Sequence, residues 1–119
     1  MNGDQIFNLG EALARADQDR ELLHAMAELF VEHGPKDLAE IKRALDARDA
    51  AAVGRSAHRL KGAVLQFSAP AVLEAAKRME EAGKAGDVTA AADLCGELEA
   101  ELSRLIDALR LAMDKGLAA

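Results

Sequence analysis

The sequence predicts an all-α fold, an antiparallel up-and-down four-helix bundle with a short additional N-terminal helix. Half of the 119 residues are hydrophobic but only three are aromatic. The interior must therefore be built mainly from Leu, Ala, Val, Ile and Met, which suits packed helices. Only Pro35 and Pro70 can interrupt a helix, and no run of alternating β-branched residues indicates a strand. The length fits one domain, so we assign residues 1–119 to a single helical-bundle domain.

Two helices are expected in the first part of the chain. The first, around Asp4 to Ala14, has apolar residues at helical spacing and ends near the polar run ADQDR, whose aspartates suit an N-cap. A longer helix runs from about Asp19 toward Leu45, with a kink or break expected at Gly34-Pro35. Its apolar stripe is expected to contain Leu22, Met26, Leu29, Phe30, Leu38, Ile41 and Leu45.

Three more helices follow, each with a start signal. Asp49 can cap the third, Pro70 can begin the fourth, which ends at the glycines of EAGKAG, and Asp87 can cap the fifth. The residues expected to face the core are Val53, Ala57, Leu60, Val64 and Phe67, then Val72, Leu73, Ala76 and Met79, then Leu94, Leu98, Leu105, Leu109 and Met113. The connections are short, which favours antiparallel packing, and the last residues, KGLAA, are expected to fray.

Composition and charge exclude several classes of function. The net charge of −6 argues against a nucleic-acid-binding protein, which needs clustered Lys and Arg. No segment approaches the ~20 apolar residues of a membrane-spanning helix, and the start MNGDQIF lacks the features of a signal peptide. We therefore expect a cytoplasmic protein. The single cysteine, Cys95, agrees with a reducing compartment and is expected to act as a small hydrophobic residue.

One face of the third helix carries the residues that suggest chemistry. If Ala57 and Leu60 face the core, then His58, Lys61 and Gly62 form a neighbouring stripe, which Leu65 extends as an apolar patch. The cation of Lys61 beside the imidazole of His58 would favour the neutral, nucleophilic ring. Glycine inside a helix costs about 1 kcal/mol relative to alanine, so Gly62 predicts that something approaches closely there.

The charge pattern around this stripe is also unusual. No carboxylate occurs between Ala50 and Leu73, although the chain has 21 Asp and Glu residues, and Arg55, Arg59 and Lys61 fall within that window. A locally basic surface would tolerate a phosphoryl group and steer an acidic partner toward it. For His58 alone, an ordinary surface side chain is the better interpretation, and Gly62 by itself could serve helix packing. The combined pattern favours a functional site.

The stretch AHRLKGA, from Ala57 to Ala63, resembles the AHxLKG signature of histidine-containing phosphotransfer (HPt) domains. The surrounding sequence, with ELLHAMAELF before it and AVLEAAKRMEEAGKAGD after it, follows the family layout from roughly Ile6 to Leu109. The resemblance implies that His58 accepts a phosphoryl group at Nε2 from an aspartyl phosphate or a kinase and passes it to a receiver-domain aspartate. It also implies that Lys61 lies near the phosphoryl oxygens.

The resemblance further implies that Gly62 leaves room for a receiver and that Glu80 accepts a hydrogen bond from Nδ1 of His58. Residue 80 falls on the inward stripe of its helix, where an unpaired carboxylate would be unfavourable, but a surface position for Glu80 remains an equal alternative. The sequence departs from the family after the motif, where Ser68-Ala69 replaces a frequent Gly-Ala pair, so the turn is expected to differ.

The partners implied by the resemblance are a response-regulator receiver domain and a sensor or hybrid histidine kinase. The receiver would supply acidic residues and Mg²⁺, so the chain itself needs no cofactor and binds no ATP. Docking is expected around His58, with contributions from the first helix and from Arg55, Arg59, Gly62, Leu65 and Gln66. The apolar stripes suffice for one bundle and leave no second seam, so a monomer is expected.

Three alternatives compete with this interpretation. Glu21-Leu22-Leu23-His24 is a Glu-x-x-His pair of the kind that binds metals in carboxylate-bridged helical bundles, but a second such pair is missing. A degenerate phosphotransfer domain that only binds receivers is also compatible with the fold, although the intact His58 argues against it. The chain is too short to include an ATP-binding kinase domain and has no glycine-rich nucleotide loop. It could still be a fragment of a kinase.

Overall fold

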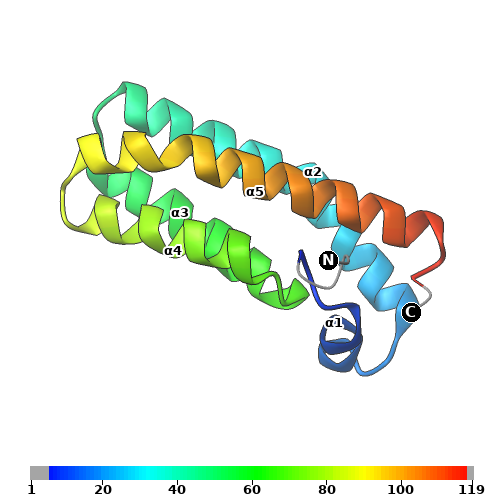
Figure 1. The fold of residues 1–119 in the computed structure, drawn as a ribbon. Helices are drawn as coiled ribbons and strands as arrows, with labels where there is room; N and C mark the ends of the chain where they lie inside the picture. Colours follow the sequence, from blue (N-terminus) through cyan, green and yellow to red (C-terminus); the bar gives the residue numbers. More distant parts are fainter. Residues whose placement is uncertain (1–5, 118–119) are drawn as a thin grey trace.

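The computed structural model describes residues 6–117 and contains a helical bundle. Its elements are α1 (Leu9–Arg15), α2 (Arg20–Asp46), α3 (Ala50–Val64), the short 3₁₀ helix η2 (Leu65–Phe67), α4 (Pro70–Lys84) and α5 (Val88–Asp114). Helices α2 to α5 run alternately up and down, and α1 lies across the end of the shorter α3–α4 pair (Figure 1). The predicted fold class, a four-helix bundle with a short N-terminal helix, is confirmed.

Aspartate and asparagine side chains cap the N-termini of four of the five α-helices. Asp19, Asp49 and Asp87 each accept a hydrogen bond from the backbone N–H three residues later, at 2.9 to 3.1 Å, as predicted. Asn8 caps α1 in the same way, so α1 begins at Leu9 and not near Asp4, which lies outside the described residues. Helix α4 has no side-chain cap and begins with Pro70 in its first turn.

Of the kink or break expected in α2 at Gly34-Pro35, the break is wrong. The helix continues through Pro35 for 27 residues, and Pro35 itself is exposed. Gly34 is buried, and a Cβ atom there would lie 3.5 Å from Leu102 of α5 and from Phe30. Packing of α2 against the bundle on both sides of Pro35 therefore compensates for the hydrogen bond that proline cannot donate.

The core is formed by the inward sides of α2 to α5, with Phe30 and Phe67 in edge-to-face contact at 5.3 Å between ring centres. The expected stripe of α2 is partly wrong, because Leu22 and Leu29 are 47% and 58% exposed. The apolar residues of α2 extend around more of the helix than the neighbouring helices cover, so some of them remain exposed. In the first turn, Leu23 and not Leu22 is the buried leucine. Leu73 and Cys95 are half-buried at the edge of the core, and burial raises the pKa of the Cys95 thiol.

The described part of the segment KGLAA does not fray as expected. Leu117 is buried, and its carbonyl oxygen accepts a hydrogen bond from Nε of Arg20 at 3.3 Å. The turn after α5 therefore packs against the start of α2, and residues 118–119 lie outside the described part. Between residues 6 and 117, no helix combines the length and the apolar character that crossing a membrane requires.

Candidate functional site

The candidate site lies on α3, whose inward face is buried and whose outward face is not. Ala57 and Leu60 are completely buried, and the neighbouring His58 side chain is 69% exposed. The outward face consists of Arg55, His58, Arg59 and Gly62, and the 3₁₀ helix η2 continues it with Leu65 and Gln66, all of them exposed. The structure thus exposes every residue of α3 and η2 that was expected to contact a partner, on the outward face that carries His58.

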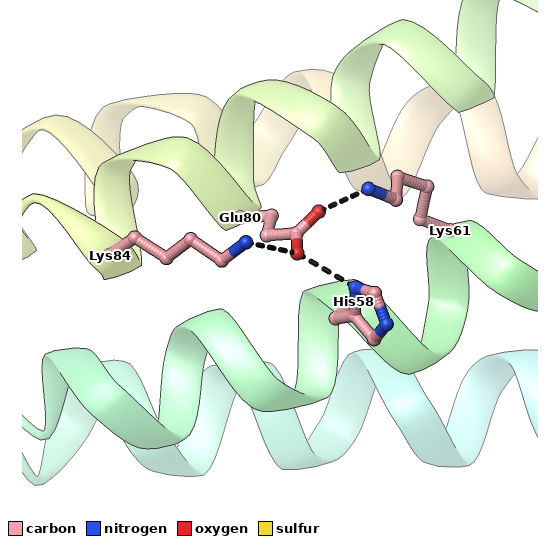
Figure 2. Close-up of polar contacts among 4 residues, drawn as sticks. All are labelled: His58, Lys61, Glu80 and Lys84. Atoms are coloured by element: carbon pink, nitrogen blue, oxygen red, sulfur yellow. Dashed lines mark hydrogen bonds and ion pairs between the residues drawn. The ribbon is translucent and has the colours of Figure 1, made fainter.

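Glu80 of α4 is the one predicted site residue that lies inside the bundle. Its side chain is 4% exposed, and its Oε2 atom lies 2.7 Å from Nδ1 of His58. An ionised carboxylate can only accept hydrogen bonds, so Nδ1 carries the proton and donates it. The other ring nitrogen, Nε2, points away from Glu80 (Figure 2). The surface position that the sequence left open for Glu80 is excluded, and Nε2 is the ring nitrogen that Glu80 leaves without a contact.

Two lysines complete the surroundings of this carboxylate (Figure 2). Nζ of Lys61 lies 2.6 Å from Oε1 of Glu80, and Nζ of Lys84 lies 3.0 Å from Oε2. Hydrogen bonds from Lys61, which has the largest effect, and from Lys84 and His58 together lower the pKa of Glu80 to about 2, although burial raises it. Lys84 was missed in the sequence. Its i,i+4 spacing from Glu80 was the signal available, but such pairs are common on exposed helices.

Two of the three cations expected to make this surface basic are paired with carboxylates. Lys61 pairs with Glu80, and Arg59 reaches across to α2, where its Nη1 lies 2.6 Å from Oε2 of Glu40 and 3.6 Å from Oδ1 of Asp37. The carboxylates that α3 lacks are thus supplied by α2 and α4, which pack on either side of it. Arg55 makes no ion pair within residues 6–117, so it is the cation of this window that stays available on the outward face.

Gly62 does not serve packing inside the bundle. It is exposed, and a Cβ atom added to it would meet no atom within 4 Å. The interpretation of Gly62 as a helix-packing residue is therefore excluded. Its missing side chain leaves open surface one helical turn from His58, which agrees with the close approach of a group from outside the chain.

The glycines that do serve packing were not recognised in the sequence. Helix α4 ends at Lys84, within EAGKAG as predicted, but Gly83 in its last turn is also buried against Gly54 of α3. A Cβ atom on Gly83 would lie 2.5 Å from the backbone nitrogen of Gly54. Beside this contact, a groove of about 720 Å³ runs along α3 and α4 and is lined by His58, Glu80 and Lys84, among others.

The turn after the motif adopts a left-handed conformation although it lacks glycine. Ser68 has φ 52° and ψ 57°, its carbonyl oxygen accepts a hydrogen bond from the backbone N–H of Asn8 at 3.0 Å, and its Oγ accepts one from Arg15. These contacts attach α1 to the end of η2. Ser68 therefore adopts a left-handed conformation that glycine adopts more readily.

The pair expected for a metal bundle does not face the interior. Glu21 is exposed, and the imidazole of His24 lies at the surface, where its Nε2 is 3.6 Å from Oε1 of Glu28. Within residues 6–117, no three His, Cys, Asp or Glu side chains are grouped closely enough to hold a metal ion. The geometry gives this alternative no support.

Comparison with known proteins identifies similar folds. Histidine-containing phosphotransfer protein B from Pseudomonas aeruginosa PAO1 superposes with a TM-score of 0.86 at 20% identity, over 92% of this chain and 96% of that one. The HPT domain of a sensor hybrid histidine kinase from Shewanella superposes with a TM-score of 0.82 at 22% identity, over 93% of this chain and 96% of that one. Comparison with curated proteins gives no significant match.

The family is established by the sequence of the bundle itself. The model of the Hpt domain matches residues 25–108, which include the whole of α3 and α4 and most of α2 and α5. The matched region contains His58, Lys61, Glu80 and Lys84. The chain belongs to the Hpt domain family and is a histidine phosphotransfer protein of phosphorelay signalling.

Proposed function

We propose that His58 is the residue that carries the phosphoryl group. The observation that supports this most directly is the 2.7 Å contact between Nδ1 of His58 and Oε2 of Glu80, which leaves Nε2 outward with its lone pair. In the transfer, the lone pair of Nε2 forms a bond to phosphorus while the bond from phosphorus to a donor aspartate oxygen breaks, and its electron pair returns to that carboxylate. The proton stays on Nδ1, so the imidazole ring becomes positively charged.

Glu80 compensates this new charge. Its carboxylate is already ionised and hydrogen-bonded to Nδ1, so it stabilises a positive ring without having to move. Lys61 and Lys84 together add two positive charges next to the single negative charge of Glu80. A phosphoryl group carries about two negative charges, so the phosphorylated site would be close to neutral. The same groups serve the reverse step, in which a receiver aspartate attacks the phosphorus.

The chain acts as a carrier and not as a kinase in this proposal. In-line phosphoryl transfer depends on positioning and on stabilising charge, and the receiver supplies its acidic residues and Mg²⁺. The protein then needs no cofactor of its own, works as a monomer and resides in the cytoplasm with its partners. The exposed surface formed by Arg55, Gly62, Leu65 and Gln66 around His58 is the docking surface for the receiver domain and for the upstream histidine kinase.

Phosphoryl uptake from a radiolabelled, phosphorylated receiver tests the proposal. The wild-type protein should acquire an acid-labile label, and His58→Gln should acquire none. His24→Gln and His33→Gln are matched controls that remove the other two histidines of the chain and should be labelled normally. Label that persists in His58→Gln would place the phosphoryl group elsewhere. A folded wild-type protein that binds a receiver but never acquires label would instead be a binding module without transfer chemistry.

A further inference from the structure

Helices α3 and α4 are in direct backbone contact at Gly54 and Gly83. A Cβ atom on Gly83 would lie 2.5 Å from N and 2.7 Å from Cα of Gly54, and 2.9 Å from the carbonyl oxygen of Ala50. All three are backbone atoms, which no change of side-chain rotamer can move. Any residue other than glycine at position 83 must therefore push the two helices apart.

This contact lies one helical turn from the candidate site. Gly54 precedes His58 by four residues on α3, and Gly83 follows Glu80 by three on α4. Residues three and four apart lie on the same side of a helix. Both glycines also line the groove that His58 and Glu80 line. The spacing of the helices at the glycines therefore determines the distance that Glu80 must span to reach His58.

The hydrogen bond of His58 leaves little tolerance for a wider spacing. Ordinary van der Waals contact begins at 3.4 Å, so relieving the 2.5 Å approach at Gly83 requires a displacement of about 0.9 Å. The same displacement at the site would stretch the 2.7 Å contact between Nδ1 and Oε2 to roughly 3.6 Å, which is no longer a hydrogen bond. Lys61 and Lys84 each hold one carboxylate oxygen and restrict the reorientation that could compensate.

We propose that Gly83 is a positioning residue of the phosphoryl-transfer site, whose lack of a side chain lets α4 approach the α3 backbone at Gly54 and holds Glu80 within hydrogen-bond distance of His58. The effect on transfer rests on the proposed function, but the effect on the hydrogen bond does not. The two glycines also differ in a way that provides a control. A Cβ atom on Gly54 would lie 3.5 Å from N of Lys84 and 3.6 Å from C of Gly83, which is ordinary contact.

Gly83→Ala and Gly54→Ala therefore form a matched pair at one helix contact. Long-range ¹H–¹⁵N NMR spectra of the imidazole ring report which nitrogen carries the proton. We expect the Nδ1–H tautomer of His58 in the wild type and in Gly54→Ala, and its loss in Gly83→Ala at a temperature where circular dichroism shows the variant folded. A folded Gly83→Ala protein that keeps the Nδ1–H tautomer would overturn the proposal.

Transfer kinetics with a phosphorylated receiver separate positioning from general damage. Gly83→Ala should lower the saturated transfer rate roughly 10- to 100-fold, as misplacement of a reacting group by about 1 Å does, and should leave the half-saturating receiver concentration unchanged. Because Gly83 acts through Glu80, adding Gly83→Ala to Glu80→Ala should slow transfer no further. A further slowing in the double variant would show that Gly83 acts by another route and would overturn the proposal.

A second variant covers the case in which Gly83→Ala does not fold. Gly54→Val keeps Gly83 but adds γ carbons to a Cβ position already in contact with the α4 backbone, so it should also weaken the Nδ1–H signal and slow transfer. If folded Gly54→Val behaves like Gly54→Ala in both measurements, the proposal fails. If the wild type accepts no phosphoryl group at all, the proposed function fails, while the tautomer measurement still decides whether Gly83 positions Glu80.

Discussion

At the scale of single residues, the site is organised around one buried carboxylate. Glu80 accepts a hydrogen bond from His58 and forms ion pairs with Lys61 and Lys84. His58 and Lys61 belong to α3, and Lys84 belongs to α4. The carboxylate would be unfavourable in the interior without these partners, and the imidazole would have no fixed tautomer without the carboxylate. Chemistry and stability at this position therefore depend on the same contacts.

The stabilisation by Glu80 should depend on pH. Its pKa is lowered from 4.5 to about 2 in the folded protein, so its stabilising effect is complete above about 4.5 and is lost as the pH falls toward about 2. Chemical denaturation of the wild type and of Glu80→Gln between pH 7 and pH 2 tests this. The wild type should be the more stable at neutral pH, and the difference in unfolding free energy should shrink below pH 4.5. A difference that stays constant over this range would contradict the assignment.

Gly62→Gln should block transfer without disturbing the fold. The position is exposed and has open space around it, so glutamine fits the helix but extends into the surface next to His58. We expect unchanged helical content by circular dichroism, a slight gain in stability because glycine is replaced within a helix, and at least a tenfold loss of phosphoryl uptake through steric exclusion of the receiver.

Gly96→Gln is the matched control for this substitution. Gly96 is also exposed, lies within a helix and has no atom within 4 Å of its Cβ position, but it belongs to α5, which packs mainly against α2 and α4. Equal losses of uptake in the two variants would mean that the loss reflects glutamine on the surface in general and not exclusion at His58. Loss of helical content in Gly62→Gln alone would make Gly62 a structural residue.

At the scale of the elements, the turn between η2 and α4 combines an unfavourable backbone conformation with two stabilising contacts. A residue other than glycine at positive φ costs roughly 1 kcal/mol. Ser68 adopts this conformation while it interacts with Asn8 and Arg15 of the N-terminal segment. The contact from the Asn8 backbone does not depend on the side chain at position 68, and the contact from Arg15 is exposed to solvent.

Ser68→Gly should therefore stabilise the protein by about 0.5 to 1 kcal/mol, because relief of the left-handed strain exceeds the loss of an exposed hydrogen bond. Thermal and urea denaturation measure the change. Arg15→Ala separates the two effects, since it removes the side-chain contact and keeps the strain, and it should lower stability only slightly. If Ser68→Gly were clearly less stable than the wild type, the contact with Arg15 would stabilise the protein by more than the left-handed backbone of Ser68 destabilises it.

At the scale of the whole molecule, α3 and α5 lie diagonally opposite each other in the bundle, because each packs against α2 and α4 (Figure 1). Helix α1 lies at the end of the bundle where η2 follows α3. The exposed residues around His58 therefore form one continuous face for a partner. The only large apolar side chain of that face is Leu65, which is 49% exposed, and Arg55 adds a cation without an ion-pair partner within residues 6–117.

Titration with an unphosphorylated receiver should move the NMR signals of Arg55, Gly62, Leu65 and Gln66 and leave Gly96 on α5 unchanged. Leu65→Ala should weaken receiver binding about 5- to 10-fold, as loss of a half-buried apolar contact does, without changing the tautomer of His58. Leu111, another exposed leucine, provides the control, and Leu111→Ala should bind normally. Shifts confined to α5 would place the docking surface elsewhere.

The sequence by itself determined the helices and the outward direction of His58, because these depend on residues close together in the chain. The aspartate caps act over three residues, and the burial of Ala57 and Leu60 beside His58 follows from helical periodicity. The tertiary structure alone decided how the helices are rotated and how closely they approach. It exposed Leu22 and Leu29, carried α2 through Pro35, paired Arg59 with Glu40, added Lys84 to the site and brought Gly54 against Gly83. The periodicity of one helix contains no information about the distance to the next, and the function of Glu80 depends on that distance.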